Sequence, residues 1–372
     1  MGDHVRTVTT VAGDRAWLVG GHARVRRLLT DRRLSRTHPD PDHAARYSDS
    51  VIFGRPQPAS ATEDADDARM RRLLTPWFSP RRMGVLRPRV QQLVDGLLDD
   101  LGRATPPVDF HEAVSFPLPA LVICELLGVP YEDREDFRRW SDDAADMTDE
   151  RRSTSGLASL WQYIQQLVEA KRAAPADDLL SELATVESSS EEVAELGAGL
   201  LFAGHQTTVA AIDTGVVLLL EDRARVDALI RDPRLVDATV EEILRLPAPV
   251  PEPDVPAAVG LPRWANADLD VDGTTIHAGE LVLLDLESAN LDPGVFEAPC
   301  AFDPSRATNP HLTFGHGPHY CIGAPLARLE LQILFATLAR RFRTLALAVP
   351  PTRLRPRSHL LTGGLESLPV TW

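Results

Sequence analysis

Residues 191–220 carry the feature that most constrains how this chain can fold. The stretch has no proline and is largely apolar, which predicts one helix about 45 Å long at 1.5 Å per residue. The polar run GHQTT and the acidic Asp213 interrupt it, which is not typical of a membrane span. We therefore interpret it as a long helix buried inside the protein.

The composition fits that interpretation. A chain of 372 residues can bury a large core, and 44% hydrophobic with 25% charged residues is typical of a soluble globular protein. A net charge of −15 argues against nucleic-acid binding, which needs net or clustered positive charge. The start, MGDHVRTVTTVAGDRAWLVGG, has no apolar signal core. From the charge and from the lack of an apolar span, we expect neither a nucleic-acid partner nor a membrane partner.

Hydrophobic periodicity predicts a mainly α chain with a minor β portion. Besides the long helix, helical patterns occur at residues 22–29, 66–78, 85–101, 116–127, 131–146, 157–172, 178–186, 237–245 and 324–342. Strands are expected within residues 5–19 and 269–286, and residues 359–372 resemble a hairpin. Six prolines between residues 246 and 262 exclude a helix there, so that run is either a domain linker or a loop.

The cysteines indicate a reducing environment. Cys124, Cys300 and Cys321 are an odd number at wide spacings, and no C-x-x-C or Cys/His zinc pattern is present. A disulfide framework is therefore disfavoured. A cytoplasmic location is the simplest setting for such a chain.

Cys321 differs from the others because of the segment around it, HLTFGHGPHYCIGAPLARLEL. Gly315, Gly317 and Gly323 permit tight turns and close approach of the backbone to a flat ligand. A helix is predicted directly after the cysteine, with Pro325 in its first turn, and the positive end of that helix favours a thiolate. A thiolate is a ligand for a soft metal centre. The alternative is a small buried cysteine in a loop.

The string FGHGPHYCIG resembles the F-x-x-G-x-x-x-C-x-G signature of the haem-thiolate monooxygenases, the cytochrome P-450 family. The resemblance implies that Cys321 is the metal ligand, bound axially to the iron of heme b, and that Phe314 shields the sulfur. His319 would reach a haem propionate, while Gly317 and Gly323 would shape the loop around the cofactor. In such proteins the thiolate gives the iron electron density that favours O–O cleavage.

Two further motifs follow in the family's order. Glu242 and Arg245 match E-x-x-R, whose spacing sets both charges on one helix face, and the resemblance implies a buried structural pair. The stretch FAGHQTTVAAID resembles the family's oxygen-binding stretch, where Gly204 would let the helix open and Thr207 would offer its hydroxyl to dioxygen. The alternative there is a glycine-induced kink with a satisfied threonine.

Arg71 and Arg263 stand at the positions of the family's propionate-binding arginines. With them the resemblance covers roughly residues 15–372, nearly the whole chain. It implies the cytochrome P-450 fold, mainly α with a long central helix over a haem, as a single domain of residues 1–372. The proline-rich run would then be a pocket-lining loop and not a linker.

The chain departs from the family's pattern at four places. Asp67 replaces a histidine that usually reaches a propionate, and an aspartate there would repel that group unless it is turned away. Gln206 replaces an acidic residue that helps proton delivery, and an amide can orient water but cannot ionise. Leu291 and Ala301 replace frequent arginines, so we expect a thinner network around the E-x-x-R pair. The family's usual first segment and helix are also expected to be missing.

The resemblance implies a monooxygenase that takes electrons from a ferredoxin and its reductase. It would use O2 to hydroxylate or otherwise oxidise a small-molecule natural product of secondary metabolism. The candidate docking surface is a positive patch on an acidic protein, made of Arg69, Arg72, Arg81 and Arg82. An ordinary solvated helix face is the alternative for that patch.

A second hypothesis belongs to a different functional class. The chain could be a catalytically impaired or haem-less relative that activates a partner protein such as a deoxysugar glycosyltransferase. Asp67 and Gln206 fit such a loss of catalytic constraint. The intact Cys321, His319 and Thr207 argue against it, because an activator has no need of a thiolate ligand.

Overall fold

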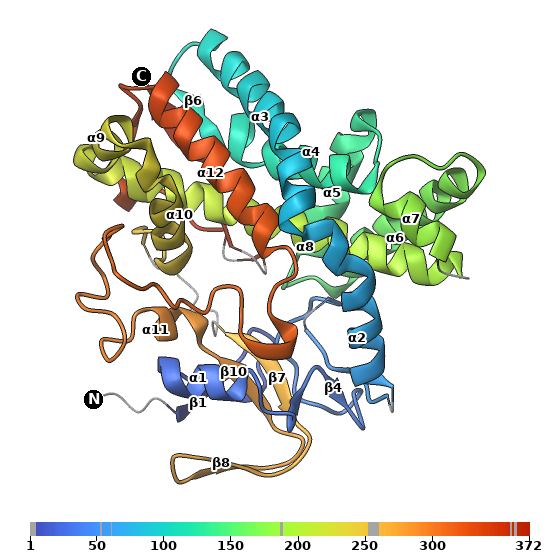
Figure 1. The fold of residues 1–372 in the computed structure, drawn as a ribbon. Coiled ribbons are helices and arrows are strands. Elements are labelled where there is room, and N and C mark those ends of the chain that lie inside the picture. The colour runs from blue at the N-terminus through green and yellow to red at the C-terminus, as the bar shows by residue number, and fades with distance from the viewer. Residues whose placement is uncertain are drawn as a thin grey trace.

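The long central helix forms as the sequence predicts. The computed structural model describes residues 5–52, 54–60, 62–186, 189–251, 260–357, 359–360 and 363–372. Helix α8 (Ser190–Glu221) runs unbroken for 32 residues and passes through the helical part of the molecule (Figure 1). The side chain of Ser189 caps its start by accepting hydrogen bonds from the backbone N–H groups of Glu191 and Glu192.

Other helices surround α8. Helices α4 (Pro117–Leu127), α6 (Glu150–Ala173) and α10 (Val236–Arg245) pack against it, and α3 (Pro80–Arg103) packs along α12 (Ala324–Arg341). The remaining helices are α1 (His22–Leu28), α2 (Glu63–Leu74), α5 (Arg134–Ala144), α7 (Leu179–Val186), α9 (Arg223–Arg231) and α11 (Leu286–Asn290), with single turns at Thr75–Phe78, His111–Ser115, Tyr131–Asp133, Pro233–Leu235, Gly317–His319 and Pro351–Arg353. These contacts bury most of α8 in one large apolar core.

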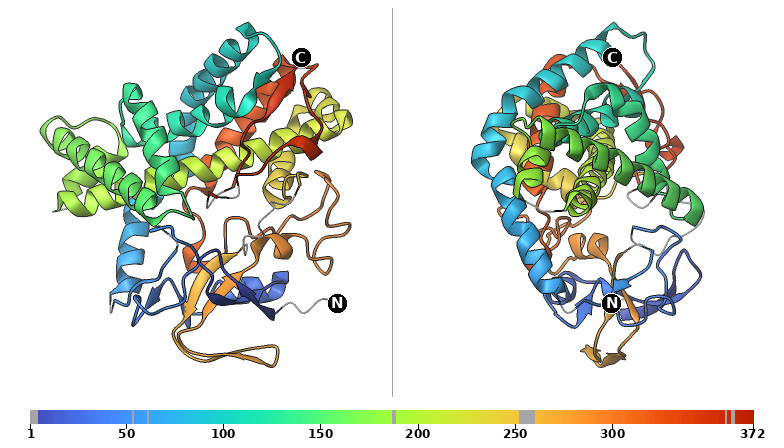
Figure 2. Two further views of the ribbon diagram at one scale, coloured as in Figure 1. Left: turned by 180° about the vertical axis from the view of Figure 1, so that it is seen from behind. Right: turned by 90° about the vertical axis from the view of Figure 1, so that its right-hand side faces the viewer.

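The main sheet lies at the other end of the molecule, with α1 and the N-terminal strands (Figure 2). Its order is β1 (Val5–Thr9), β2 (Arg15–Val19), β10 (Leu281–Leu284), β7 (Leu261–Ala265) and β3 (Leu34–Ser35), with β10 parallel to β2 and the other neighbours antiparallel. Smaller ladders join β4 (Thr37–His38) to β5 (Gln57–Pro58), β8 (Leu269–Val271) to β9 (Thr274–Ile276), and β12 (Pro369–Thr371) to β11 (Ala346–Leu347) and β6 (Val108–Asp109). A second, separate apolar core lies under this sheet.

Local turn chemistry explains the β8–β9 hairpin. Asp272 and Gly273 both adopt positive φ, 54° and 85°, the backbone that a two-residue type I′ hairpin turn requires. Gly279, at φ 87°, makes the second turn expected in this region. The predicted strands and turns of residues 269–286 are therefore confirmed.

The observed helices begin at other residues than predicted where a capping side chain, and not hydrophobicity, sets the first residue. Helix α6 begins at Glu150 and not at residue 157, because Asp149 accepts hydrogen bonds from the N–H groups of Arg151 and Arg152. Helix α9 was not predicted, and it begins after another capping aspartate, Asp222. No helix in the described part of the chain is long and apolar enough to cross a membrane.

The proline-rich run and the tail are partly described. Residues 252–259 lie outside the described residues, and the end of the run forms the start of β7. The tail does turn back on itself, since the N–H of Arg357 donates to Gly364 O at 2.9 Å and the N–H of Glu366 donates to Arg355 O at 2.9 Å. Its last strand, β12, instead pairs with β11 and β6.

Candidate active site

The loop before α12 holds Cys321 in a closed turn. The N–H of Cys321 donates to Phe314 O at 2.8 Å, which folds the loop back on itself. Gly315 and Gly317 make this possible with positive φ of 71° and 76°. A Cβ added to Gly317 would also lie 2.5 Å from Thr30 Cγ2, so the loop packs closely on the segment after α1. Cys321 itself is exposed.

The environment of the Cys321 sulfur is mixed. Desolvation raises the pKa of the thiol, while hydrogen bonds from the N–H groups of Gly323 and Ala324, and then the charges of Arg71 and Arg328, act to lower it. Burial therefore favours the neutral thiol, yet the donors that would stabilise a thiolate are already in place. A bound metal ion would deprotonate such a thiol outright.

An aromatic and ionic cluster supports the loop from behind. The guanidinium of Arg328 lies 4.6 Å from the Phe314 ring centroid and donates to Tyr320 Oη at 3.2 Å. Arg328 Nε also donates to Glu241 Oε1 at 2.6 Å, and His311 Nε2 lies 3.1 Å from Glu241 Oε2. Burial alone would raise the pKa of Glu241, but the hydrogen bonds from Arg328 and His311 outweigh it and lower the pKa to about 2. This carboxylate therefore stays charged and keeps the loop tied to α10.

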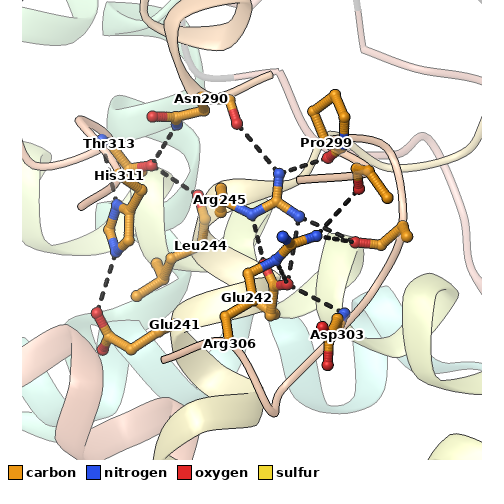
Figure 3. Close-up of polar contacts among 12 residues, drawn as sticks. Glu241, Glu242, Leu244, Arg245, Asn290, Pro299, Asp303, Arg306, His311 and Thr313 are labelled. Atoms are coloured by element: carbon orange, nitrogen blue, oxygen red, sulfur yellow. Dashed lines mark hydrogen bonds and ion pairs between the residues drawn. The ribbon is translucent and has the colours of Figure 1, made fainter. Parts of the chain in front are cut away.

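Glu242 and Arg245 form the predicted buried pair (Figure 3). Arg245 Nε lies 2.5 Å from Glu242 Oε2, and the two side chains are 0% and 1% exposed. The rest of the Arg245 guanidinium donates to the backbone carbonyls of Asn290 (3.1 Å), Pro299 (2.5 Å) and Ala301 (3.0 Å). A buried guanidinium with this many partners ties α10 to the segment that leads into the cysteine loop.

The expectation of a thinner network here was wrong. Arg306 supplies a second guanidinium, whose Nε donates to Glu242 Oε1 at 2.6 Å (Figure 3). It also donates to Ala298 O at 3.0 Å and Ala301 O at 3.1 Å. At Ala301 the backbone carbonyl thus joins the network, although the side chain cannot. The positive charge is supplied by Arg306, which follows Ala301 by five residues.

Three arginines, Arg36, Arg71 and Arg263, form a cation cluster around His319 beside the cysteine loop. The three predicted propionate ligands, Arg71, Arg263 and His319, are therefore brought together. Arg71 donates to Tyr320 O, and His319 Nδ1 lies 3.3 Å from Asp67 Oδ2. Desolvation lowers the pKa of His319, and the charges of Arg36, Arg263 and Arg71 lower it further while Asp67 opposes them. These residues come from α2, β7 and the cysteine loop, together with the link between β3 and β4.

The structure corrects the expectation for Asp67. Its carboxylate is not a lone negative charge, because Arg36 Nη2 donates to both of its oxygens at 2.9 and 2.8 Å. His319 adds the third contact noted above. Asp67 is therefore neutralised within the cluster. Sequence reading missed Arg36, which lies 31 residues away and belongs to no recognisable motif.

The central helix presents Thr207 but does not open. Thr207 is exposed, and so is Ala203 one turn earlier, although α8 is buried along most of its length. Thr207 Oγ1 donates to Ala203 O at 2.8 Å, so the hydroxyl is satisfied within an intact helix. Gly204 has a packing role, since an added Cβ would lie 2.9 Å from Ile123 Cδ1 of α4. The predicted opening at Gly204 is therefore wrong for this structure.

The Gln206 side chain is hydrogen-bonded to a neighbouring helix. The side chain is buried, and Nε2 donates to Asp142 Oδ1 on α5 at 2.7 Å. Asp142 Oδ2 accepts a second hydrogen bond from Arg357 Nη2 at 3.1 Å. The Nε2 group of the amide is therefore engaged by Asp142. A carboxylate is nevertheless present, contributed by a residue 64 positions away that no sequence motif singled out.

Replacing Glu242 with Gln tests the buried network. The change leaves two guanidinium groups without their carboxylate, and Arg245 is fully buried. We expect the free energy of unfolding to fall by about 3–5 kcal/mol in a denaturant titration, the usual consequence of removing one partner of a buried ion pair. The control is Glu221→Gln, which breaks the exposed pair with Arg225 and should cost less than about 1 kcal/mol. Equal losses would contradict the structural role of Glu242.

Replacing Gln206 with Glu tests the contact with Asp142. Two carboxylates this close cannot both ionise easily, so one pKa rises in the folded protein. Above about pH 4 the folded state then binds more protons than the unfolded chain, and stability relative to the parent falls as pH rises. We expect the difference in Tm to widen from about pH 5 to about pH 8.

The matched control for that substitution is Gln332→Glu, because the Gln332 side chain accepts from Arg87 Nη2 at 3.5 Å. There the new carboxylate faces a cation, so Tm should not fall with pH. A Gln206→Glu difference that does not change with pH would show that Asp142 and residue 206 do not interact in solution.

Comparisons with known proteins agree with this geometry. The model of the Cytochrome P-450 family matches residues 114–363. Pentalenolactone synthase from Streptomyces exfoliatus is 41% identical over 97% of this chain and 91% of its own length. The cytochrome P-450 monooxygenase PikC from Streptomyces venezuelae is 38% identical over 98% of this chain and 87% of its own length.

Solved structures give the same answer. Substrate-free cytochrome P-450 PimD, described as a polyene macrolide antibiotic pimaricin epoxidase, has a TM-score of 0.86 and 39% identity over 99% of this chain and 93% of its own. The predicted fold, mainly α with a minor β portion, is therefore confirmed. The chain belongs to the cytochrome P-450 family, whose members are oxidoreductases that hold haem through a cysteine thiolate.

Proposed function

We propose that this chain hydroxylates or otherwise oxidises a small-molecule natural product of secondary metabolism. The observation that carries the proposal is its 41% and 38% identity to a pentalenolactone synthase and to the monooxygenase PikC, over nearly the whole chain. The likeness to a macrolide epoxidase supports the same class of substrate. We also propose that residues 1–372 act as a single domain, because these alignments extend over almost all of them.

The residues of the candidate site fit heme b. Cys321 is exposed as a residue, and its sulfur receives backbone hydrogen bonds at the start of α12, which suits a thiolate ligand. The cation cluster of Arg36, Arg71 and Arg263 lies around His319 beside that loop, where it suits the carboxylates of the cofactor. When bound, heme b supplies the activation of O2 and the oxidising chemistry.

On the cysteine side, the chain positions and protects the sulfur. We propose that Cys321 would hold the iron through its sulfur and that Phe314, held by the guanidinium of Arg328, would shield that sulfur from water. Gly317 and Gly323 allow the loop its close approach. The N–H groups that already point at the sulfur would spread its negative charge and so tune its donor strength.

On the side of α8, Thr207 is the group proposed to handle protons. Its hydroxyl donates to Ala203 O and keeps its lone pairs available, so it can accept a hydrogen bond from a water molecule on the exposed face of the helix. Gln206 cannot ionise and is held by Asp142. The ionisable group that supports this stretch is therefore Asp142, and Gly204 contributes by allowing α8 to pack on α4.

We propose a ferredoxin and its reductase as electron donors. Arg69 and Arg72 are exposed on α2, and Arg81 is exposed at the start of α3. Helix α2 contacts the cysteine loop, because Arg71 donates to Tyr320 O. Arg82 contributes less than expected, because its guanidinium lies 4.1 Å from the Trp77 ring centroid and 3.4 Å from Asp177 Oδ1. We also propose a cytoplasmic location, which three free cysteines favour.

The haem-less auxiliary hypothesis has less support. The relatives reported above are described as a synthase, a monooxygenase and an epoxidase, which are enzymes. Asp67 and Gln206, which suggested loss of constraint, both have specific partners in the structure. We therefore do not propose the activator role for this chain.

Carbon monoxide binding to the reduced protein tests the proposed ligand. We expect a red-shifted Soret band typical of thiolate-ligated haem, and we expect Cys321→Ala to abolish it. The control is Cys300→Ala, another exposed cysteine outside the loop, which should leave the band unchanged. A protein that binds no haem when haem is supplied during expression, or a band that survives Cys321→Ala, would overturn the assignment.

A ligand titration tests the substrate class. Macrolides and lactones related to pentalenolactone should displace solvent in the ferric protein and shift its absorbance toward the high-spin form. At least one compound should then give an oxygenated product when ferredoxin, reductase and NADPH are supplied. If simple fatty acids bind and react while every macrolide and lactone fails, the proposed natural-product substrate is wrong.

A further inference from the structure

Arg36 lies where the sheet meets the cation cluster. It is the single residue between β3 and β4, and its carbonyl accepts from the N–H of Gln57 at 2.9 Å. Strand β3 pairs with β7 so that Ser35 is opposite Trp264. Continuing that antiparallel register by one residue sets Arg36 opposite Arg263. Backbone pairing therefore brings a third arginine to the two that the sequence motifs identified.

Asp67 fixes the Arg36 side chain from the other side. Both Asp67 oxygens accept from the same nitrogen, Arg36 Nη2, at 2.9 and 2.8 Å. While Asp67 holds Nη2, the Arg36 side chain remains 39% exposed. The guanidinium is therefore fixed in position and still accessible to a further anion.

The charges beside the cysteine loop indicate what that anion is. Arg36, Arg71 and Arg263 act on His319 as positive charges, and Asp67 acts as a negative charge. Heme b carries two propionate carboxylates, which match guanidinium groups in charge and in hydrogen-bonding chemistry.

We propose that Arg36 binds a propionate of the haem and that Asp67 is a positioning residue, which holds Arg36 in place. The pair thus takes over the task that a histidine at position 67 would perform. This inference rests on the haem of the family and not on the proposed substrate. It can fail while the oxidation of a natural product stands.

Haem retention by the purified holoprotein tests the proposal. The measurement is the rate at which haem transfers to an excess of apomyoglobin, followed by absorbance. Losing one charge-assisted hydrogen bond to a carboxylate should speed haem loss by about tenfold in Arg36→Gln. Asp67→Asn should speed it less, because the guanidinium keeps its charge.

The double variant distinguishes propionate binding by Arg36 from a purely structural ion pair between Arg36 and Asp67. In Arg36→Gln the Asp67 carboxylate stays beside the propionates without its partner, so adding Asp67→Asn should slow haem loss again. If the pair were only a structural ion pair, both single variants and the double variant would lose haem at one common rate. That result would overturn the proposal.

The matched control is Arg33→Gln. Arg33 is also paired with an aspartate in the same segment, with Nη2 2.7 Å from Asp31 Oδ2. Its loss should leave haem retention unchanged. If Arg33→Gln releases haem as fast as Arg36→Gln, the effect is general destabilisation and the proposal is wrong.

Arg36→Lys with a modified cofactor covers the case in which Arg36→Gln does not fold. A lysine keeps the charge but loses the planar fork, so native haem should leave faster than from the parent protein. When both proteins are reconstituted with haem dimethyl ester, whose propionates cannot ionise, the difference should disappear. A difference that persists with the ester would show that Arg36 does not act on the propionates.

Discussion

The position of the cysteine loop depends on one buried carboxylate, that of Glu242. It accepts from Arg245, from Arg306 and from the N–H of Asp303, and it is almost wholly excluded from solvent. A charge in that environment has to remain paired, so the segments that carry its partners have little freedom. Glu242 therefore holds together α10 and the irregular chain between α11 and the cysteine loop, where no regular hydrogen-bond ladder is available.

Neutral contacts extend that constraint to the loop itself (Figure 3). Asn290, whose carbonyl accepts from Arg245, uses its side chain to accept from the N–H of Leu312 at 2.7 Å and to donate to Thr313 Oγ1 at 2.9 Å. Thr313 Oγ1 in turn donates to Leu244 O at 2.6 Å. The chain thus enters the cysteine loop with its first residues fixed to α10 on one side and α11 on the other.

The sequence was informative wherever the signal is local. The long helix, the turns at Asp272 and Gly273, and the spacing around Cys321 all follow from neighbouring residues, and the structure reproduces them. At the three internal departures from the family's pattern, the structure adds a partner that the sequence did not indicate. Arg36 neutralises Asp67, Asp142 engages Gln206, and Arg306 reaches Glu242, over 31, 64 and 64 residues. No periodicity or motif identifies a partner at such separations, because tertiary packing alone selects it.

At Gly204, a local sequence signal predicted a helix opening that the structure does not show. A glycine before a threonine in a long helix suggested an opening, yet the helix is continuous and the missing Cβ makes room for Ile123 of the neighbouring helix. Close helix packing and local unwinding both favour glycine, so residue identity cannot distinguish them. The neighbouring helix decides, and its approach is known only once the chain is folded.

The pairing of Asp67 with Arg36 also limits how this chain can evolve. Replacing Asp67 with histidine alone would leave Arg36 beside a second basic group, and replacing Arg36 alone would leave the Asp67 carboxylate without its arginine. The effects of the two substitutions are therefore expected to be non-additive, as for other residues in contact. A change at either position constrains which residues the other position can accept.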